Sequence, residues 1–120
     1  MSGGRSAKSK GTRVEREMVK KLEGEDIPAW RVPMSGSLGG SLNSDLKIGP
    51  EKEWDVEVKA RSGGGGFVQL ERWLGNNHFL FLKRDRQDPL VTMEWGVFVE
   101  LFKSHLAHTE YKEDIENATK

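Results

Sequence analysis

The chain has 120 residues, equal numbers of basic and acidic side chains (19 of each) and no cysteine. This length supports one domain with a single modest core, and the lack of cysteine excludes disulfides and thiolate metal sites. We expect neither a membrane span nor a secretory signal, because no run approaches the roughly eighteen apolar residues of a span. An intracellular, cytoplasmic location fits best, and any bound metal must use oxygen or histidine ligands.

The first 21 residues are basic although the whole chain is neutral. They contain seven Lys or Arg and two Glu, a local net charge of +5. A basic end suits a protein that grips phosphate groups, but a solvated tail gives the same pattern. Residues 1–9 are rich in Gly, Ser and Lys without periodicity, so we predict a flexible basic arm there.

A helix is predicted from Arg13 to about Glu23. Thr12 and Glu15 have the spacing of a capping box, which places Thr12 at the N-cap. The apolar stripe of this helix consists of Val14, Met18, Val19 and Leu22. Because Glu15 borders the stripe, it can serve the cap, a site beside the buried face, or both.

A short strand is predicted over residues 29–32, between two prolines. A loop dense in Gly and Ser follows over residues 34–44. Loops of this length are usually either linkers or functional segments. Small, hydroxylated residues can let a phosphodiester backbone approach and donate hydrogen bonds to it, so both interpretations stay open.

A hairpin over residues 45–59 is the central prediction. If Asp45 lies opposite Glu57, one face is apolar and the other holds both carboxylates. The same register pairs Leu46 with Val56, Lys47 with Asp55 and Ile48 with Trp54. It leaves an odd-length loop that contains Gly49 and Pro50.

The hairpin carries the residues of a metal-dependent nuclease. Glu57 and Lys59 are two residues apart, so they share one strand face. Carboxylates from neighbouring strands hold a hard cation such as Mg²⁺ through oxygen, and a lysine can orient water near a phosphate. Alternation alone also predicts the alternative, a half-buried strand with a solvated charged face.

Residues 61–120 are predicted to add two helices and two strands. Arg61–Gly66 is a flexible passage that lacks the Lys and Ser/Thr of a nucleotide P-loop, so no nucleotide cofactor is expected. The predicted elements are a helix over 68–74, a buried strand over 78–83, an edge strand over 90–95, a helix over 97–106 and a polar tail over 109–120. His105 and His108, spaced i, i+3, fit either a metal site or an ordinary helix surface.

Four segments together resemble the archaeal-type Holliday junction resolvases, a branch of the PD-(D/E)xK nuclease superfamily. Residues 10–17, KGTRVERE, look like the opening K-G-x-x-x-E-R-E motif, and Arg31 followed by Ser35-Gly36-Ser37 is similar to R-x(n)-G-S. Residues 44–46 and 56–59 match the (P/V)-D-(L/I) and (I/V)-E-(V/C)-K motifs. The order of the four segments makes the resemblance fairly specific.

The resemblance implies an α/β nuclease domain over residues 10–108 with a restriction-endonuclease-like fold, a mixed central β-sheet flanked by helices. It implies a homodimer that makes symmetric paired nicks in four-way DNA junctions with Mg²⁺, for which Mn²⁺ can substitute. We expect part of the dimer interface on the apolar surface from Val91 to Phe102. A viral or archaeal source fits the small size.

The resemblance also assigns the site residues. The implied acidic metal-site residues are Glu15, Asp45 and Glu57, with Lys59 to orient water or stabilise charge. The implied DNA contacts are Arg13, Arg16, Arg31, Ser35 or Ser37, Arg61 and Gln69. The loop between Arg31 and Asp45 is longer than in many relatives, and the chain is more neutral. Both differences concern the strength and geometry of DNA binding more than the chemistry. The alternatives are another endonuclease of the superfamily, such as a phage or restriction-like enzyme, and a non-catalytic DNA-binding module.

Overall fold

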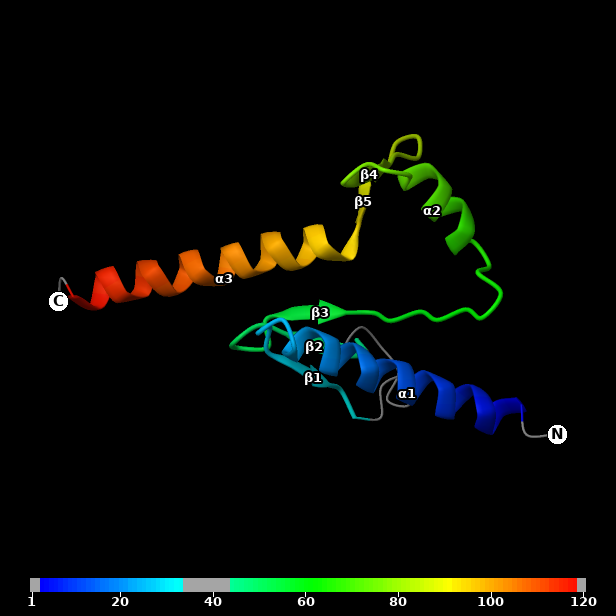
Figure 1. Ribbon diagram of the computed structural model, residues 1–120, viewed down its shortest axis with the longest axis horizontal. Coiled ribbons are helices and arrows are strands. Elements are labelled where there is room, and N and C mark those ends of the chain that lie inside the picture. The colour runs from blue at the N-terminus through cyan, green and yellow to red at the C-terminus, as the bar shows by residue number, and fades with distance from the viewer. Residues whose placement is uncertain (1–2, 34–43, 119–120) are drawn as a thin grey trace. The chain divides into compact units, whose positions relative to one another are not determined.

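The computed structural model describes residues 3–33 and 44–118 (Figure 1). Its elements are α1 (Gly3–Glu23), β1 (Ala29–Arg31), β2 (Leu46–Ile48), β3 (Trp54–Val56), α2 (Phe67–Leu74), β4 (Phe79–Leu82), β5 (Leu90–Met93) and α3 (Trp95–Ala118). The chain divides into two compact units, Met1–Ala60 and Arg61–Lys120. The predicted α/β class is confirmed, and the predicted domain over residues 10–108 stays a prediction.

The first unit contains a three-stranded antiparallel sheet in the order β1-β2-β3. Strands β2 and β3 pair as predicted, and the loop that joins them has five residues and begins with Gly49 at φ 101°. The described ladder ends at the Leu46–Val56 pair, so the predicted pairing of Asp45 with Glu57 is not part of it. Strand β1 pairs with β2 so that Arg31 lies opposite Leu46.

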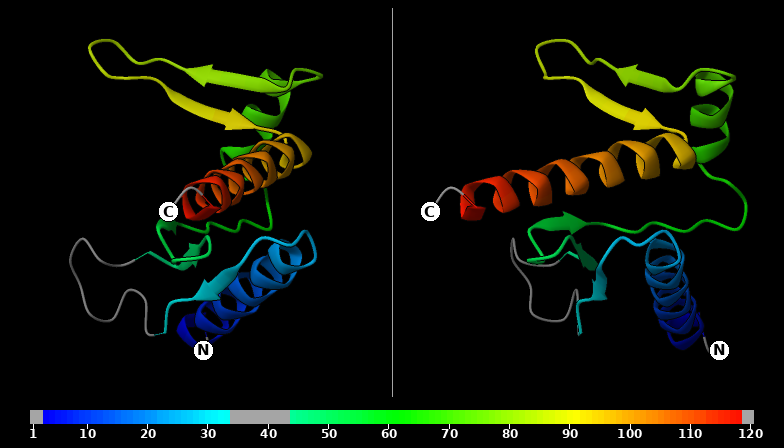
Figure 2. Two further views of the ribbon diagram at one scale, coloured as in Figure 1. Left: turned by 90° about the vertical axis from the view of Figure 1, so that its left-hand side faces the viewer. Right: turned by 60° about the vertical axis from the view of Figure 1, so that its left-hand side comes forward.

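Helix α1 packs against β1 (Figure 2). The core of this unit consists of Leu22, Ile27, Ala29, Leu46 and Ile48, all buried. The helix begins at Gly3, so the predicted start after a Thr12 cap is wrong and part of the expected arm is helical. Arg5, Ala7, Lys8 and Lys10 favour helix in this segment, whereas its Gly and Ser residues do not, so helix propensity alone does not explain the extension.

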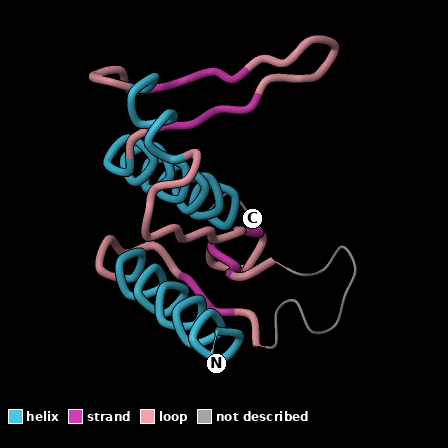
Figure 3. The backbone as a smooth tube through the Cα atoms, turned by 90° about the vertical axis from the view of Figure 1, so that its right-hand side faces the viewer, coloured by secondary structure: helices cyan, strands magenta, loops and turns pink. Residues whose placement is uncertain are grey.

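In the second unit, α2 lies between two glycines with positive φ, Gly66 at 83° and Gly75 at 53°. This confirms the predicted helix within one residue of its start. Strands β4 and β5 form a two-stranded antiparallel sheet (Figure 3), and α2 contacts β4. The predicted burial of β4 is wrong, because Phe79 and Phe81 are exposed while only the alternate side chains are half-buried.

Helix α3 is longer than predicted, since it extends from Trp95 to Ala118 and includes most of the expected polar tail. Val97 N donates a hydrogen bond to the Glu94 carboxylate at 3.2 Å and to the Glu94 carbonyl at 3.1 Å, so Glu94 caps the first turn of the helix. That cap ends β5 at Met93, before the predicted Trp95.

The strand pairs of the described residues are antiparallel and belong to two sheets, of three and two strands. We expected one mixed central sheet, so the restriction-endonuclease-like arrangement stays a proposal. Within residues 3–33 and 44–118, no helix combines the length and the apolar character needed to cross a membrane.

Candidate functional site

A partly buried ion pair between α1 and β1 forms the centre of the candidate site. Arg31 Nε lies 3.6 Å from Glu15 Oε1, and Glu15 is only 9% exposed. Strand alternation puts Arg31 on the same face as buried Ala29. Among the described residues, neither Glu15 Oε1 nor Arg31 Nε has a hydrogen-bond partner.

The carboxylate of Glu15 is in an unfavourable environment for its negative charge. Burial raises the pKa of Glu15 above its ordinary value of 4.5, and the neighbouring Asp45 carboxylate raises it further. The Arg31 guanidinium lowers this pKa, while Glu57 adds a smaller increase. Two of the predicted acidic residues, Asp45 and Glu57, therefore act electrostatically on the third, Glu15.

Asp45 is held in place from two sides. Its backbone carbonyl accepts a hydrogen bond from Val32 N at 2.9 Å. Its side-chain Oδ2 accepts one from Val58 N at 2.8 Å, and its own amide donates to Val56 O at 2.9 Å. Because the bonds reach the chain after β1 and the chain after β3, they fix Asp45 at the end of the sheet.

Glu57 and Lys59 follow the end of β3 and form an ion pair, with Lys59 Nζ 3.1 Å from Glu57 Oε1. Both side chains are more than half exposed. Their spacing in the sequence predicted that they would share one side of the chain, and this contact agrees with it. The pair is accessible from solvent, in contrast to Glu15.

The donor chemistry of these residues fits Mg²⁺ or Mn²⁺, which prefer carboxylate oxygen. In the described part of the chain, no three Asp, Glu or His side chains lie close enough together to hold a metal ion as they stand. The fit is carried by the buried Oε1 of Glu15, which has no hydrogen-bond partner among the described residues, and by the repulsion that Asp45 and Glu57 exert on Glu15. A cation would relieve both.

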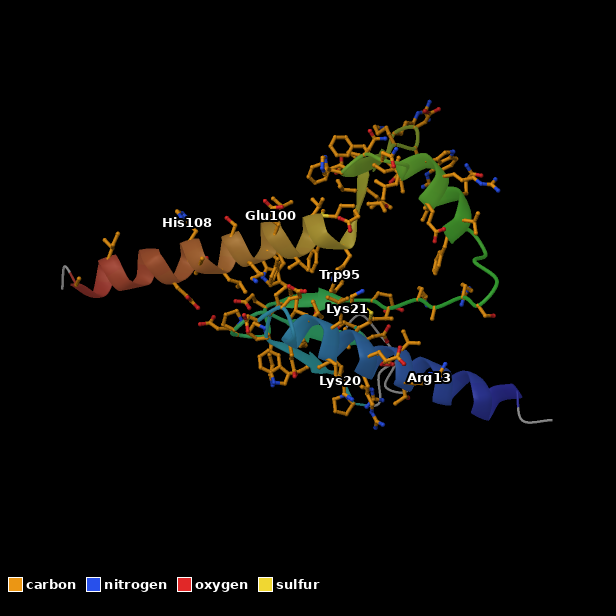
Figure 4. The ribbon with its side chains drawn as sticks, in the orientation of Figure 1. Arg13, Lys20, Lys21, Trp95, Glu100 and His108 are labelled. Atoms are coloured by element: carbon orange, nitrogen blue, oxygen red, sulfur yellow. The ribbon has the colours of Figure 1, made fainter. Side chains whose placement is uncertain are left out.

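The predicted DNA contacts are distributed over the chain. Arg13 and Arg16 are exposed on α1, and Figure 4 shows Arg13, Lys20 and Lys21 projecting from this helix. Arg61 and Gln69 are exposed in the second unit, so their place beside Glu15 stays a prediction. Ser35 and Ser37 lie outside the described residues.

Two polar arrangements lie outside the predicted set of site residues. Asp55 Oδ1 accepts hydrogen bonds from Lys47 Nζ at 2.6 Å and Ser44 Oγ at 3.0 Å, which lower the pKa of Asp55. Lys52 Nζ lies 4.9 Å from the ring centroid of Trp30. The predicted register already paired Lys47 with Asp55, whereas nothing in the sequence pattern pointed to the Lys52–Trp30 contact.

The Glu15–Arg31 ion pair is a further contact that the sequence does not predict, since the resemblance assigns Arg31 to phosphate. The sequence signal for this contact is that Arg31 shares a strand face with the apolar Ala29, which places Arg31 toward the core. Comparisons of the chain with protein families, with curated proteins and with solved structures found no match. Interpretation of the site therefore depends on its own residues.

Proposed function

We propose that the protein is a divalent-metal-dependent DNA endonuclease of the PD-(D/E)xK type that resolves four-way junctions. The observation that carries the proposal is the electrostatic grouping of Glu15, Asp45 and Glu57, with Arg31 and Lys59 beside it. Three carboxylates around a partly buried position, next to two cations, suit a site that binds a metal ion and a phosphodiester together.

Each side chain has a distinct role in this proposal. Glu15, Asp45 and Glu57 would hold Mg²⁺ or Mn²⁺, which would supply Lewis-acid polarisation of the phosphodiester when bound. Lys59, held 3.1 Å from Glu57, orients the attacking water or stabilises the developing negative charge. The hydrogen bond from Val58 N to Asp45 fixes that carboxylate before the substrate arrives.

The proposed substrate and assembly follow from the resemblance. Two copies related by a two-fold axis would cut two opposed strands of a junction, because dimer symmetry then matches substrate symmetry. The exposed apolar side chains Val91 and Leu101, inside the expected interface region, support a contact with a second copy. The exposed arginines of α1 supply phosphate contacts.

A non-catalytic DNA-binding module is the second candidate. The observations that favour it are the Glu57–Lys59 ion pair, which occupies both groups with each other, and the absence of a ready three-ligand group among the described residues. In that case the basic residues of α1 bind phosphates while the carboxylates only position Arg31. Cleavage separates the two candidates.

The test is incubation of the purified protein with a labelled immobile four-way junction and a matched linear duplex, in Mg²⁺ and in EDTA. We expect paired nicks near the branch point in Mg²⁺ only, which Glu57→Ala abolishes. Glu51→Gln, an exposed residue of the β2–β3 loop, is the matched control and should cut like wild type.

The outcomes rank the candidates directly. Equal cutting of junction and duplex would keep the nuclease assignment and remove junction selectivity. Junction binding without cutting, in wild type and in Glu57→Ala alike, would favour the binding module. Loss of cutting in Glu51→Gln as well would show that Glu57→Ala acts through the fold of the hairpin.

A further inference from the structure

We propose that Arg31 is a built-in counter-ion that occupies Glu15 when no divalent cation is bound, and that a cation competes with Arg31 for Glu15 Oε1. This inference deepens the proposed function and rests on its cation site. Arg31 then acts as a positioning residue for Glu15 and sets the affinity of the site for the cation.

The first step of the argument is burial. Glu15 is nine-tenths buried, and a buried carboxylate is costly unless a positive charge or hydrogen bonds compensate it. The Arg31 guanidinium is the positive partner for Glu15. Without it, Glu15 would face Asp45 and Glu57, which both carry the same charge.

The second step is the geometry of the pair. A structural Arg–carboxylate pair normally makes short, often bidentate hydrogen bonds. Here the Nε–Oε1 distance is 3.6 Å, and neither atom has a hydrogen-bond partner among the described residues. The ion pair compensates the charge of Glu15 but gives neither atom a hydrogen bond, so Glu15 Oε1 can still bind a closer partner.

The third step is the chemistry of that closer partner. A hard cation bonds carboxylate oxygen at about 2.0–2.6 Å, well inside the separation of the ion pair. Asp45 and Glu57 would favour the same cation, since both carboxylates raise the negative potential at Glu15. Arg31 opposes the cation by charge repulsion, and removing its charge should therefore strengthen cation binding.

The test measures cation binding and thermal unfolding of the full chain without DNA. Wild type, Arg31→Gln and Arg31→Lys are titrated with Ca²⁺ by calorimetry and melted in EDTA and in Ca²⁺. The matched control is Arg13→Gln, because Arg13 forms an exposed pair with Glu17 on the same helix, at 3.9 Å. The double variant Glu15→Gln/Arg31→Gln removes both charges together.

We expect Arg31→Gln to bind Ca²⁺ at least about tenfold more tightly than wild type, because nearby unit charges interact strongly. In EDTA it should melt at a lower temperature, and Ca²⁺ should restore the loss. Arg31→Lys and Arg13→Gln should resemble wild type in both measurements. The double variant should melt near wild type in EDTA and bind Ca²⁺ more weakly than Arg31→Gln.

Equal Ca²⁺ affinity of Arg31→Gln and wild type would overturn the proposal, as would a loss of stability that Ca²⁺ does not reduce. If Arg31→Gln does not fold, the double variant decides. A double variant that is also unfolded means that Arg31 acts through contacts other than the charge of Glu15, which overturns the counter-ion role. If only the nuclease assignment is wrong, the junction assay shows no cleavage while the Ca²⁺ titrations still show competition between Arg31 and the cation.

Discussion

The two halves of the chain use their apolar residues differently. In the described residues, the buried apolar side chains of the first unit are Leu22, Ile27, Ala29, Leu46 and Ile48, and that of the second is Val99. The exposed large apolar side chains are Trp30 and Trp54 in the first unit, against Val68, Trp73, Phe79, Phe81, Leu90, Val91, Leu101 and Ile115 in the second. The first unit therefore positions a polar site on a core, whereas the second presents apolar surface suited to binding another surface.

The largest expected effect comes from the same truncation made in each unit. Leu46→Ala removes a side chain that is 1% exposed and should lower the free energy of unfolding by about 2–5 kcal/mol. Leu90→Ala, at 69% exposure, should change it by less than about 1 kcal/mol. Urea unfolding measures both. If both variants lose the same free energy of unfolding, the contrast between the two units is wrong, because Leu90 must then be covered in solution.

Asp45 should matter next most. Asp45→Ala removes the part-buried bond from Val58 N, and loss of a hydrogen bond to a charged group costs about 1.5–3 kcal/mol. The counterpart in the second unit is Asp85→Ala, which removes an exposed carboxylate and should leave the unfolding midpoint nearly unchanged. A similar midpoint for the two variants would mean that the Asp45–Val58 bond contributes little.

The pH dependence of stability should distinguish Glu15 from Glu100, an exposed residue of α3. A raised folded-state pKa gives stability that is present below about 4.5 and lost as the pH rises through the raised pKa. In EDTA, the melting temperature of Glu15→Gln minus that of wild type should therefore be larger at pH 7 than below pH 4.5. Glu100→Gln is the exposed control, and a constant difference between Glu15→Gln and wild type across this pH range would contradict the pKa shift of Glu15.

The smallest expected effect concerns the exposed Asp55. Because Lys47 and then Ser44 hold the pKa of Asp55 below its ordinary value of 3.8, Lys47→Met should raise it toward that value. NMR titration of the Asp55 carboxyl group measures this. Any stability from the Lys47 bond is present above pH 3.8 and fades as the pH falls through the lowered pKa. An unchanged titration would mean that Lys47 does not hold Asp55 in solution.

Local patterns predicted the hairpin and α2 well. The register of β2 and β3 follows from alternation, since a slip by one residue would turn Leu46 and Ile48 to the other face. The limits of α2 follow from Gly66 and Gly75, whose positive φ values suit glycine. Both predictions depend on residues close together in the chain.

Other features depended on contacts that no local pattern contains. The apolar run of β4 indicated burial, but burial requires a covering surface, and Phe81 stays 69% exposed. The Glu15–Arg31 pair depends on how α1 packs against β1. The Asp45–Val58 bond uses a backbone amide, which a side-chain pattern does not show.

The positions of these contacts along the chain bear on synthesis. The Glu15–Arg31 pair, the Asp45–Val58 bond and the ladders of β1, β2 and β3 all lie within Met1–Ala60. Contacts between residues close in sequence form quickly, because little chain entropy is lost in closing the loops. The polar frame of the site can therefore assemble while Arg61–Lys120 is still being translated, before the apolar residues of that half leave the ribosome.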